Sequence, residues 1–303
     1  MSLSKNKKSF VVLLLVAAGL AGGCVQFESG MDRYDSGDYE GAYKQWRLLA
    51  DFGDRRAQNF IGLMFDKGEG VPENDSEAVM WFRKAALGGL ASAQNNLGIM
   101  YRNGAGVPVN YSLATRWFKL AFEQGHLDAT NNLGVMFDLG LGVAEDDGEA
   151  ARLFRAAADR GHARAMNNLG RMYDKGEGVT QDLSVAADLF RKAALLGDAE
   201  AQNNFAVMLD NGRGVEIDPG KATEWFLKAA MRGDLSARIN LGKRYMSSAA
   251  SSEELIKAYA WFNLAASSGD KEAKSLKSSV AQRLSPVQIR TAQKQSNSLL
   301  ATR

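Results

Sequence analysis

Cysteine and histidine are scarce in this sequence, and each shortage excludes a kind of protein. Cys24 is the single cysteine among 303 residues, so the chain forms no internal disulfide. The two histidines, His126 and His162, lie 36 residues apart. At equivalent places on stacked helices they would be about 10 Å apart, whereas each ligand of one zinc ion lies about 2 Å from it. We therefore expect no metal site.

Catalytic motifs are also lacking. The glycine-rich segments, such as "GEGV" and "GAGV", follow no predicted strand and precede no Lys-Ser/Thr pair, so they do not make a phosphate-binding loop. The many acidic residues include no isolated pair that the sequence places in a dry cleft. We expect a protein that is not an enzyme and that needs no cofactor.

Excess charge of either sign is absent. Lys and Arg number 37 against 35 Asp and Glu, which gives a formal net charge of +2. Lys5, Lys7 and Lys8 lie near the N-terminus, and the net charge of the chain without these three lysines falls from +2 to −1. A balance this close to zero predicts no nucleic-acid partner.

Long hydrophobic runs are missing except for Phe10–Leu20, which follows the three lysines. This run is too short to span a bilayer and is flanked like an export signal. The letters "LAGGC" that end at Cys24 resemble a bacterial lipobox, although Ala21 stands where that motif prefers leucine. We expect residues 1–23 to be a signal peptide and Cys24 to be lipidated. Cleavage without a lipid and an uncleaved anchor are the alternatives.

The residue after Cys24 bears on which membrane would hold the lipid. No aspartate follows Cys24, and in enteric-type sorting this absence favours the outer membrane over the inner one. The expected location is therefore an exported, lipid-anchored protein that faces the periplasm.

A 36-residue repeat is what the sequence does contain. The segment "SAQNNLGIMYRNGAGV", Ser92 to Val107, recurs as "RAQNFIGLMFDKGEGV", "DATNNLGVMFDLGLGV", "RAMNNLGRMYDKGEGV" and "EAQNNFAVMLDNGRGV". One alanine and one glycine keep their register in seven copies. The alanines are Ala57, Ala93, Ala129, Ala165, Ala201, Ala237 and Ala273, and the glycines are Gly53, Gly89, Gly125, Gly161, Gly197, Gly233 and Gly269.

Each repeat predicts a pair of helices. Over 93–103, apolar residues recur with helical period, and glycines then end the helix and permit positive φ in the loop. A capping residue starts the second helix, which carries the apolar face; these caps are Asn74, Asn110, Asp146, Asp182 and Asp218. Glu77 and Glu149 predict capping boxes. Small residues that allow close helix contact recur in the first helix: Gly62, Gly98, Gly134, Gly170 and Gly242.

These residues resemble the Sel-like repeat (SLR), a branch of the tetratricopeptide superfamily. The matching motifs are "NNLGIMY", "GAGV", an Asn or Asp four residues on, "WF", "KAA" and a glycine, over roughly residues 30–274. The resemblance implies an all-α, right-handed alpha-solenoid of about seven antiparallel helix pairs with a C-terminal capping helix. We accordingly expect an N-terminal tetratricopeptide-like unit over 27–53, the SLR array over 54–269, and capping helices over 270–303, one of which starts at Pro286.

Two asparagines in each repeat are the candidate functional residues. If Ala93 is set at 0° on a helical wheel, the apolar stripe lies near about 25°, Asn95 at about 200° and Asn96 at about −60°. Asn96 and its equivalents are expected to bond loop backbone of the neighbouring repeat. Asn95 and its equivalents point away from the core, on the helices that line the inner face in the resembling superfamily.

Amides on that inner face suit an extended peptide. Neighbouring helices pack about 8–10 Å apart and an extended peptide advances about 3.3 Å per residue, so one amide meets every third residue. Aliphatic side chains and a mildly acidic row lie beside the amides. The predicted partner groove consists of Asn59, Asn95, Asn131, Asn167, Asn203, Asp66, Arg102, Asp138, Asp174 and Asp210, with Leu63, Ile99, Val135 and Val207 as its aliphatics. The alternative is a solvated face whose asparagines have no such role.

The resemblance implies an adaptor. We expect a non-enzymatic envelope scaffold that binds an envelope protein through an extended or basic segment, with the membrane reached through the N-terminal lipid. A periplasmic binder of peptidoglycan or exported polysaccharide is the alternative, and it requires exposed tryptophans, whereas their offsets place the five in the core. A β-lactam-binding or β-lactam-hydrolysing enzyme is third, because this chain lacks the paired cysteines of such relatives.

Overall fold

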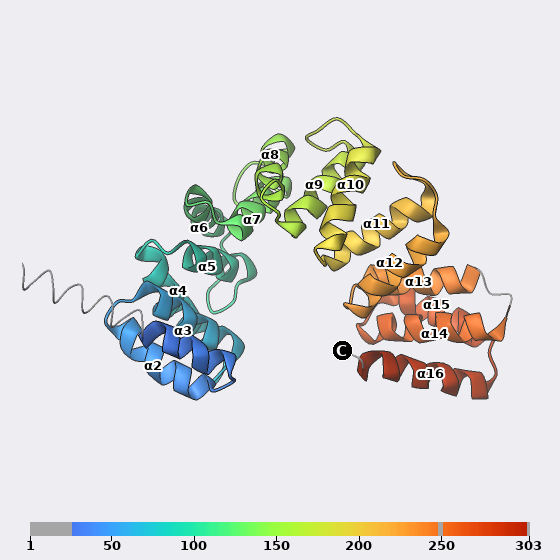
Figure 1. Cartoon of the computed structure of the whole chain (residues 1–303), viewed down its shortest axis with the longest axis horizontal. Coiled ribbons are helices and arrows are strands. Elements are labelled where there is room, and N and C mark those ends of the chain that lie inside the picture. The colour runs from blue at the N-terminus through green and yellow to red at the C-terminus, as the bar shows by residue number, and fades with distance from the viewer. Residues whose placement is uncertain (1–25, 248–250, 302–303) are drawn as a thin grey trace, which may run out of the picture. The chain divides into compact units, whose positions relative to one another are not determined.

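A computed structural model describes residues 26–247 and 251–301, so the predicted signal peptide and Cys24 lie outside the described residues. Every element in this part of the chain is an α-helix. The helices form two compact units, the first ending at Asp146 and the second starting at Asp147. Within each unit, consecutive helices lie side by side (Figure 1). The predicted all-α array of helix pairs is confirmed.

The first unit begins with a helix over 26–35. Its further helices are α2 (Tyr39–Asp51), α3 (Arg55–Lys67), α4 (Asp75–Leu87), α5 (Ala91–Asn103), α6 (Tyr111–Glu123) and α7 (Leu127–Asp138). The pairs are α3 with α4 and α5 with α6, and each first helix begins about one turn after the previous second helix ends. The helix predicted over 93–103 starts two residues earlier, at Ala91.

The second unit continues the same alternation. Its helices are α8 (Asp147–Ala158), α9 (Ala163–Lys175), α10 (Leu183–Leu195), α11 (Ala199–Asn211), α12 (Pro219–Met231), α13 (Leu235–Ser247), α14 (Ser252–Ser267), α15 (Lys271–Ala281) and α16 (Pro286–Ala301). None of the described helices is both long enough and apolar enough to cross a membrane.

Side-chain caps start the second helix of a pair, as predicted. Asn110 Oδ1 accepts the backbone N–H of Leu113 at 2.9 Å, which satisfies one of the free donors of the first turn. Equivalent bonds form at Asn74, Asp182 and Asp218. The capping box predicted from Glu77 is wrong, because the N–H of Asn74 donates to the carbonyl of Phe65 at 2.8 Å and so is already satisfied.

Glycine in the first helix lets an aromatic ring of the second helix reach the backbone. A Cβ atom built at Gly98 would lie 2.6 Å from Cε1 of Phe118, which is fully buried. The same contact recurs between Gly62 and Phe82, Gly170 and Phe190, and Gly242 and Phe262. In these four repeats, the predicted close approach of the paired helices therefore has a specific partner, one phenylalanine of the second helix.

The loop glycines place one repeat on the previous one. Gly104 and Gly106 have φ of +74° and +66°, and a Cβ at Gly106 would lie 2.4 Å from the backbone carbon of Asp75. The loop after α5 thus packs on the start of α4. Only glycine combines this conformation with this approach at low cost.

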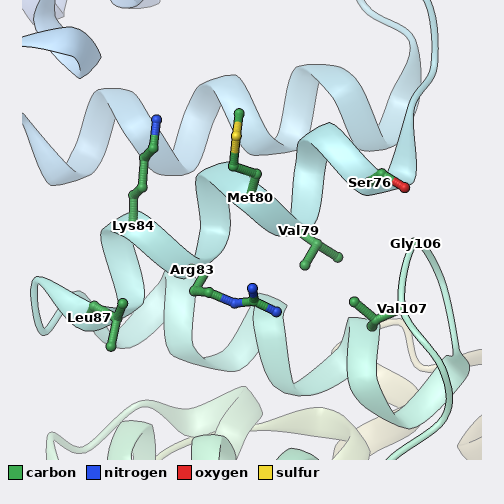
Figure 2. Close-up of a pocket in the computed structure, with 8 residues that line it drawn as sticks. All are labelled: Ser76, Val79, Met80, Arg83, Lys84, Leu87, Gly106 and Val107. Atoms are coloured by element: carbon green, nitrogen blue, oxygen red, sulfur yellow. The ribbon is translucent and has the colours of Figure 1, made fainter.

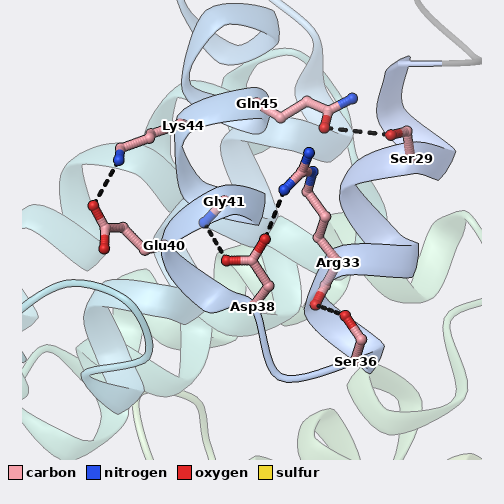
Figure 3. A network of polar contacts seen from close by, with 8 residues as sticks. All are labelled: Ser29, Arg33, Ser36, Asp38, Glu40, Gly41, Lys44 and Gln45. Carbon is pink, nitrogen blue, oxygen red and sulfur yellow. Dashed lines mark hydrogen bonds and ion pairs between the residues drawn. The ribbon is translucent and has the colours of Figure 1, made fainter.

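The N-terminal pair is held by polar contacts around its turn (Figure 3). Asp38 accepts the N–H of Gly41 at 3.0 Å and forms an ion pair with Arg33 at 2.6 Å. Trp46 of α2 is fully buried, and its indole N–H donates to the carbonyl of Phe27 at 3.1 Å. These contacts fix the helix over 26–35 against α2.

The C-terminal helix α16 begins at Pro286, as predicted. The backbone N–H of Ser285 donates to Gln288 Oε1 at 2.8 Å, and the N–H of Gln288 donates to Ser285 Oγ at 3.3 Å, which makes a reciprocal capping box. The helix packs on α14, where Asn263 Nδ2 donates to Ser296 Oγ at 3.0 Å. This arrangement covers the last complete pair.

Candidate protein-binding face

The first asparagine of each repeat is buried, contrary to the expectation that it faces an open groove. Asn59, Asn95, Asn131, Asn167 and Asn203 are between 1% and 7% exposed. The helical wheel places them correctly away from the core of their own helix pair. The expectation fails at Asn59, Asn95, Asn167 and Asn203 because the first helix of the following repeat in the same unit covers them.

The second asparagine provides that cover through an amide–amide hydrogen bond. Asn96 Nδ2 donates to Asn59 Oδ1 at 3.0 Å, and Asn132 Nδ2 donates to Asn95 Oδ1 at 2.9 Å. In the second unit, the donors Asn204 and Asn240 repeat this bond. The predicted bond from Asn96 to loop backbone is therefore wrong. We call this series of side-chain bonds the amide ladder.

Three of the buried amides have an Nδ2 group without an acceptor in the described chain, whereas Asn203 Nδ2 donates to Asn204 Oδ1 at 3.4 Å. Asn59, Asn95 and Asn167 accept through Oδ1, and among the described residues no acceptor bonds to their Nδ2. The fully buried, unpartnered polar side-chain atoms in the described chain are Trp81 Nε1 and Gln202 Oε1. All three asparagines are no more than 5% exposed, so their Nδ2 groups offer little surface to a ligand.

Half-buried side chains flank the ladder on the same helices. In the first unit these are Leu63, Ile99 and Val135, and we call this surface of the first unit the first-helix face; Val207 has the equivalent position in the second unit. The charged positions Asp66, Arg102, Asp138, Asp174 and Asp210 are half-buried too. These aliphatic and charged side chains have the partial exposure that the predicted groove requires.

The charged row is mostly neutralised within the protein. Asp174 pairs with Arg213 at 2.7 Å, and Asp210 pairs with Arg244. Arg102 Nη1 donates to Asn132 Oδ1 at 3.4 Å, so it joins the amide ladder. Asp66 differs, because no hydrogen bond or ion pair of its carboxylate occurs in the described part of the chain.

A hollow of about 200 Å³ opens on this face between α3 and α5. Its apolar wall contains Leu63, Ile99, Phe82 and Met100. Its polar side contains Asp66, Asn96 and Asn103. We call it the Asp66 hollow. Burial raises the pKa of Asp66, and the charges of Asp75 and Glu73 add to that rise, while Lys67 opposes it.

A second hollow, of about 330 Å³, lies on the second helix α4 (Figure 2). Val79 of α4 and Val107 of the loop after α5 face each other across it. Its cations already have partners, since Arg83 Nη2 donates to the Tyr101 hydroxyl at 2.8 Å and Lys84 Nζ lies 3.9 Å from the centre of the Trp81 ring. Both of these cations are therefore engaged within the protein.

The tryptophans are poorly placed for stacking on sugars. Trp46, Trp81 and Trp261 are buried, and Trp117 and Trp225 are half-buried. Trp225 packs edge-on against Phe205, and Lys228 Nζ lies 4.1 Å from the centre of its ring. No fully exposed indole occurs among the described residues.

Both histidines cap helices. His126 Nδ1 accepts the N–H of Ala129 at 3.3 Å, and His162 Nδ1 accepts the N–H of Ala165 at 3.1 Å. In the described residues, no three His, Cys, Asp or Glu side chains gather closely enough to hold a metal ion. The position before the first helix is thus a capping position, filled by Asp54, Asp198, Asp234 and Asp270 in other repeats.

Sequence reasoning missed a glutamine that joins successive pairs. Gln58, Gln94 and Gln202 donate through Nε2 to carbonyls of the preceding second helix, at Ala50, Ala86 and Ala194. The amide ladder was missed as well, although the sequence contains a signal for it. Phe60 replaces the second asparagine in the first repeat, and the residue 37 positions before it, Gly23, has no side-chain acceptor.

Comparison with known proteins identifies the family that this repeat geometry belongs to. A model of the Sel1 repeat matches six consecutive segments: residues 55–90, 91–126, 127–162, 163–198, 199–234 and 235–270. The chain belongs to the Sel1 repeat family. The SLR resemblance is thereby confirmed. Sel1 repeat solenoids are in general protein–protein interaction scaffolds without catalytic activity.

Solved structures of two Sel1 repeat proteins are similar to this Sel1 repeat chain. A Sel1 repeat protein from Oxalobacter formigenes is 32% identical, with a TM-score of 0.73, and the match covers 79% of this chain and 96% of that one. A protective antigen of uropathogenic Escherichia coli with an SLR fold is 31% identical, with a TM-score of 0.66. That match covers 94% of this chain but 62% of the antigen, so this chain spans less than two thirds of it. A comparison with curated proteins found no match.

Proposed function

We propose that this protein is a non-catalytic scaffold of the bacterial envelope that binds an extended segment of another protein along its first-helix face. The observation that carries the proposal is the set of half-buried aliphatic side chains, Leu63, Ile99 and Val135, on successive first helices of the first unit, beside the hollow that contains Asp66. Such aliphatic side chains can bury apolar side chains of an extended segment.

The spacing of these aliphatic side chains fits such a ligand. Leu63, Ile99 and Val135 lie on successive first helices of the first unit, and packed helices lie about 8–10 Å apart. Three residues of an extended chain cover about 10 Å. A bound segment would therefore meet one of these aliphatic side chains about every third residue.

Capture with matched variants tests the binding face. Ile99→Glu places a charge on the half-buried first-helix face, and Leu195→Glu places the same charge on an exposed residue of the second helix α10. Parent and Leu195→Glu proteins are expected to retain the same partner from solubilised envelopes, and Ile99→Glu to lose it while its melting temperature stays close to the parent's. Equal capture by all three would contradict the proposed face.

The envelope location is the second part of the proposal, and it rests on the export signal and on Cys24. A lipid on Cys24 would place the anchor two residues before the first described helix. Cells that express the parent chain are expected to yield it in the membrane fraction, labelled by a fatty-acid analogue. A Cys24→Ser variant is expected in the soluble fraction without label. A parent chain that fractionates as soluble would refute the anchor and leave the binding face to be tested separately.

A further inference from the structure

We propose that the Asp66 hollow is a subsite for one lysine or arginine side chain of the bound segment. The inference rests on the proposed function, because it names the chemistry of a ligand that binds the same face. It concerns the first unit by itself, since every residue that lines the hollow lies between α3 and the loop after α5.

The walls of the hollow suit the stem of a long cationic side chain. Leu63 and Ile99, which line the hollow, are half-buried, and Phe82 and Met100, which line it too, are buried. A volume of about 200 Å³ is several times the ~30 Å³ share of one liquid water, so the methylene groups of lysine or arginine fit. Such side chains bury their stems along apolar surface and keep the charge at a polar end.

Two residues that line the hollow, Asp66 and Asn96, carry oxygen acceptors. Asp66 supplies a carboxylate that has no ion-pair partner among the described residues. Asn96 donates through Nδ2 to Asn59, which leaves its Oδ1 without a donor in the described chain. An ammonium or guanidinium group carries only donors. The Asp66 carboxylate and Asn96 Oδ1 therefore lack hydrogen-bond donors within the described part of the protein, and a cationic side chain supplies them.

The aspartates at the equivalent position of other repeats form ion pairs within the protein. Asp174 pairs with Arg213 at 2.7 Å, and Asp210 pairs with Arg244. In both places the protein itself puts a guanidinium on the carboxylate. The cation nearest in sequence to Asp66, Lys67, has Nζ 3.9 Å from Glu69 Oε1 instead. A ligand cation in the Asp66 hollow would complete the pattern that the second unit completes internally.

The charges around Asp66 favour a cation further. Burial is the main cause of the raised pKa of Asp66; Asp75 at the start of α4 raises it further, Lys67 of α3 opposes the rise, and Glu73 in the loop before α4 adds a little to it. Arg102 of α5 is bonded to Asn103 and Asn132. A bound cation would stabilise the ionised carboxylate, so acid should weaken binding. Because the pKa of Asp66 is raised, this weakening begins at a higher pH than for an ordinary aspartate.

Titration with short peptides tests the subsite on the purified full-length protein. The probe is acetyl-Ala-Ala-Lys-Ala-Ala-amide, and the control peptide replaces lysine by norleucine, which keeps the stem without the charge. Methyl resonances of Leu63 and Ile99 report binding. The lysine peptide is expected to bind roughly 10-fold more tightly than the norleucine peptide, since charge-assisted bonds exceed neutral contacts. Its affinity should fall between neutral pH and about pH 4.

Matched variants complete the test. Asp66→Asn should reduce lysine-peptide binding to the norleucine level, whereas Asp174→Asn, which removes an acid already paired with Arg213, should not change it. Equal binding of both peptides, or unchanged lysine binding by Asp66→Asn, would overturn the subsite. If the peptide test fails in this way while Ile99→Glu loses capture of the partner, the subsite is refuted and the proposed function stands. Lysine-specific binding with no capture on this face would instead support the subsite and refute the proposed function.

Discussion

At the scale of single residues, the asparagine pair shows which side-chain properties the sequence predicts and which it does not. The helical wheel correctly predicts that Asn95 and Asn96 face different surroundings. It cannot predict what covers Asn95, because the wheel describes one helix and the cover comes from Asn132 on the next first helix. The glutamine bonds of Gln58 and Gln94 escaped for the same reason. Positions of side chains on their own helix are predictable, whereas contacts between repeats are not.

The amide ladder predicts a measurable coupling between Asn59 and Asn96. Each single change to alanine removes one partner of a 3.0 Å bond and is expected to lower the free energy of unfolding by about 1 kcal/mol. The double variant should lose less than the sum, since the bond can be lost only once. Urea titration of the four proteins measures this. Additive losses would mean that the bond contributes nothing.

Asp66 predicts a gain in stability when it is replaced. Burial raises its pKa, so the ionised carboxylate is disfavoured in the folded chain and stability is lost as pH rises through that pKa. Asp66→Asn should therefore be more stable than the parent at neutral pH, and the difference should vanish in acid, where the parent carboxyl is protonated. Urea midpoints across the pH range check the sign.

Asp188 serves as the control with the opposite sign. Hydrogen bonds from Lys192 and Arg191 lower its pKa, so its ionised form adds stability above the ordinary carboxyl range and that stability is lost as pH falls. Asp188→Asn should be less stable than the parent at neutral pH. If both variants shift the same way, the stability assigned to Asp66 does not come from its charge.

At the scale of helices, the sequence was a good guide because the signals are local. The caps at Asn110 and Asp182 and the loop glycines act within a few residues of their own position. The capping box from Glu77 failed, since the N–H it would have bonded is taken by Phe65 in the other helix of the same pair. Local chemistry thus fixes where helices start and end, and packing decides which optional bonds form.

Close packing within a pair predicts that Gly98→Ala destabilises the protein. The added Cβ would lie 2.6 Å from the Phe118 ring, and such overpacking costs about 1–3 kcal/mol. The higher helix propensity of alanine offsets up to about 1 kcal/mol of this. Thermal unfolding of the variant measures the balance.

Gly220→Ala is the matched control for that change. Gly220 lies in the first turn of α12, is exposed, and its added Cβ would come no closer than 3.4 Å to Asp218 Oδ1. This variant is expected to keep or slightly raise the melting temperature. An equal loss in both variants would show that alanine itself, and not the ring contact, is responsible.

At the scale of the whole molecule, the division at Asp146 was not predictable from the repeat. The Sel1 repeat over 127–162 continues through it, and its motifs look like those of its neighbours. Within each unit the helices contact their neighbours in sequence. Stability in such an array is a sum of local terms and nearest-neighbour terms, so damage should stay local.

Hydrogen exchange tests this locality. Gly98→Ala is expected to speed amide exchange in α5, α6 and the adjoining α4, and to leave α11 to α14 in the second unit at the parent rates. The reason is that α5 shares its packed surface with α4 and α6. Uniform acceleration along the chain would show that the array unfolds as one cooperative body.

The central claim is that another protein lies directly on the first-helix face, and photo-crosslinking in living cells tests it most directly. A benzophenone amino acid replaces Ile99 on that face in one strain and the exposed Leu195 of α10 in another. We predict a discrete adduct with one partner at position 99, none at position 195, and a weaker adduct when Asp66→Asn is added. Adducts at position 195 with none at position 99 would contradict the account.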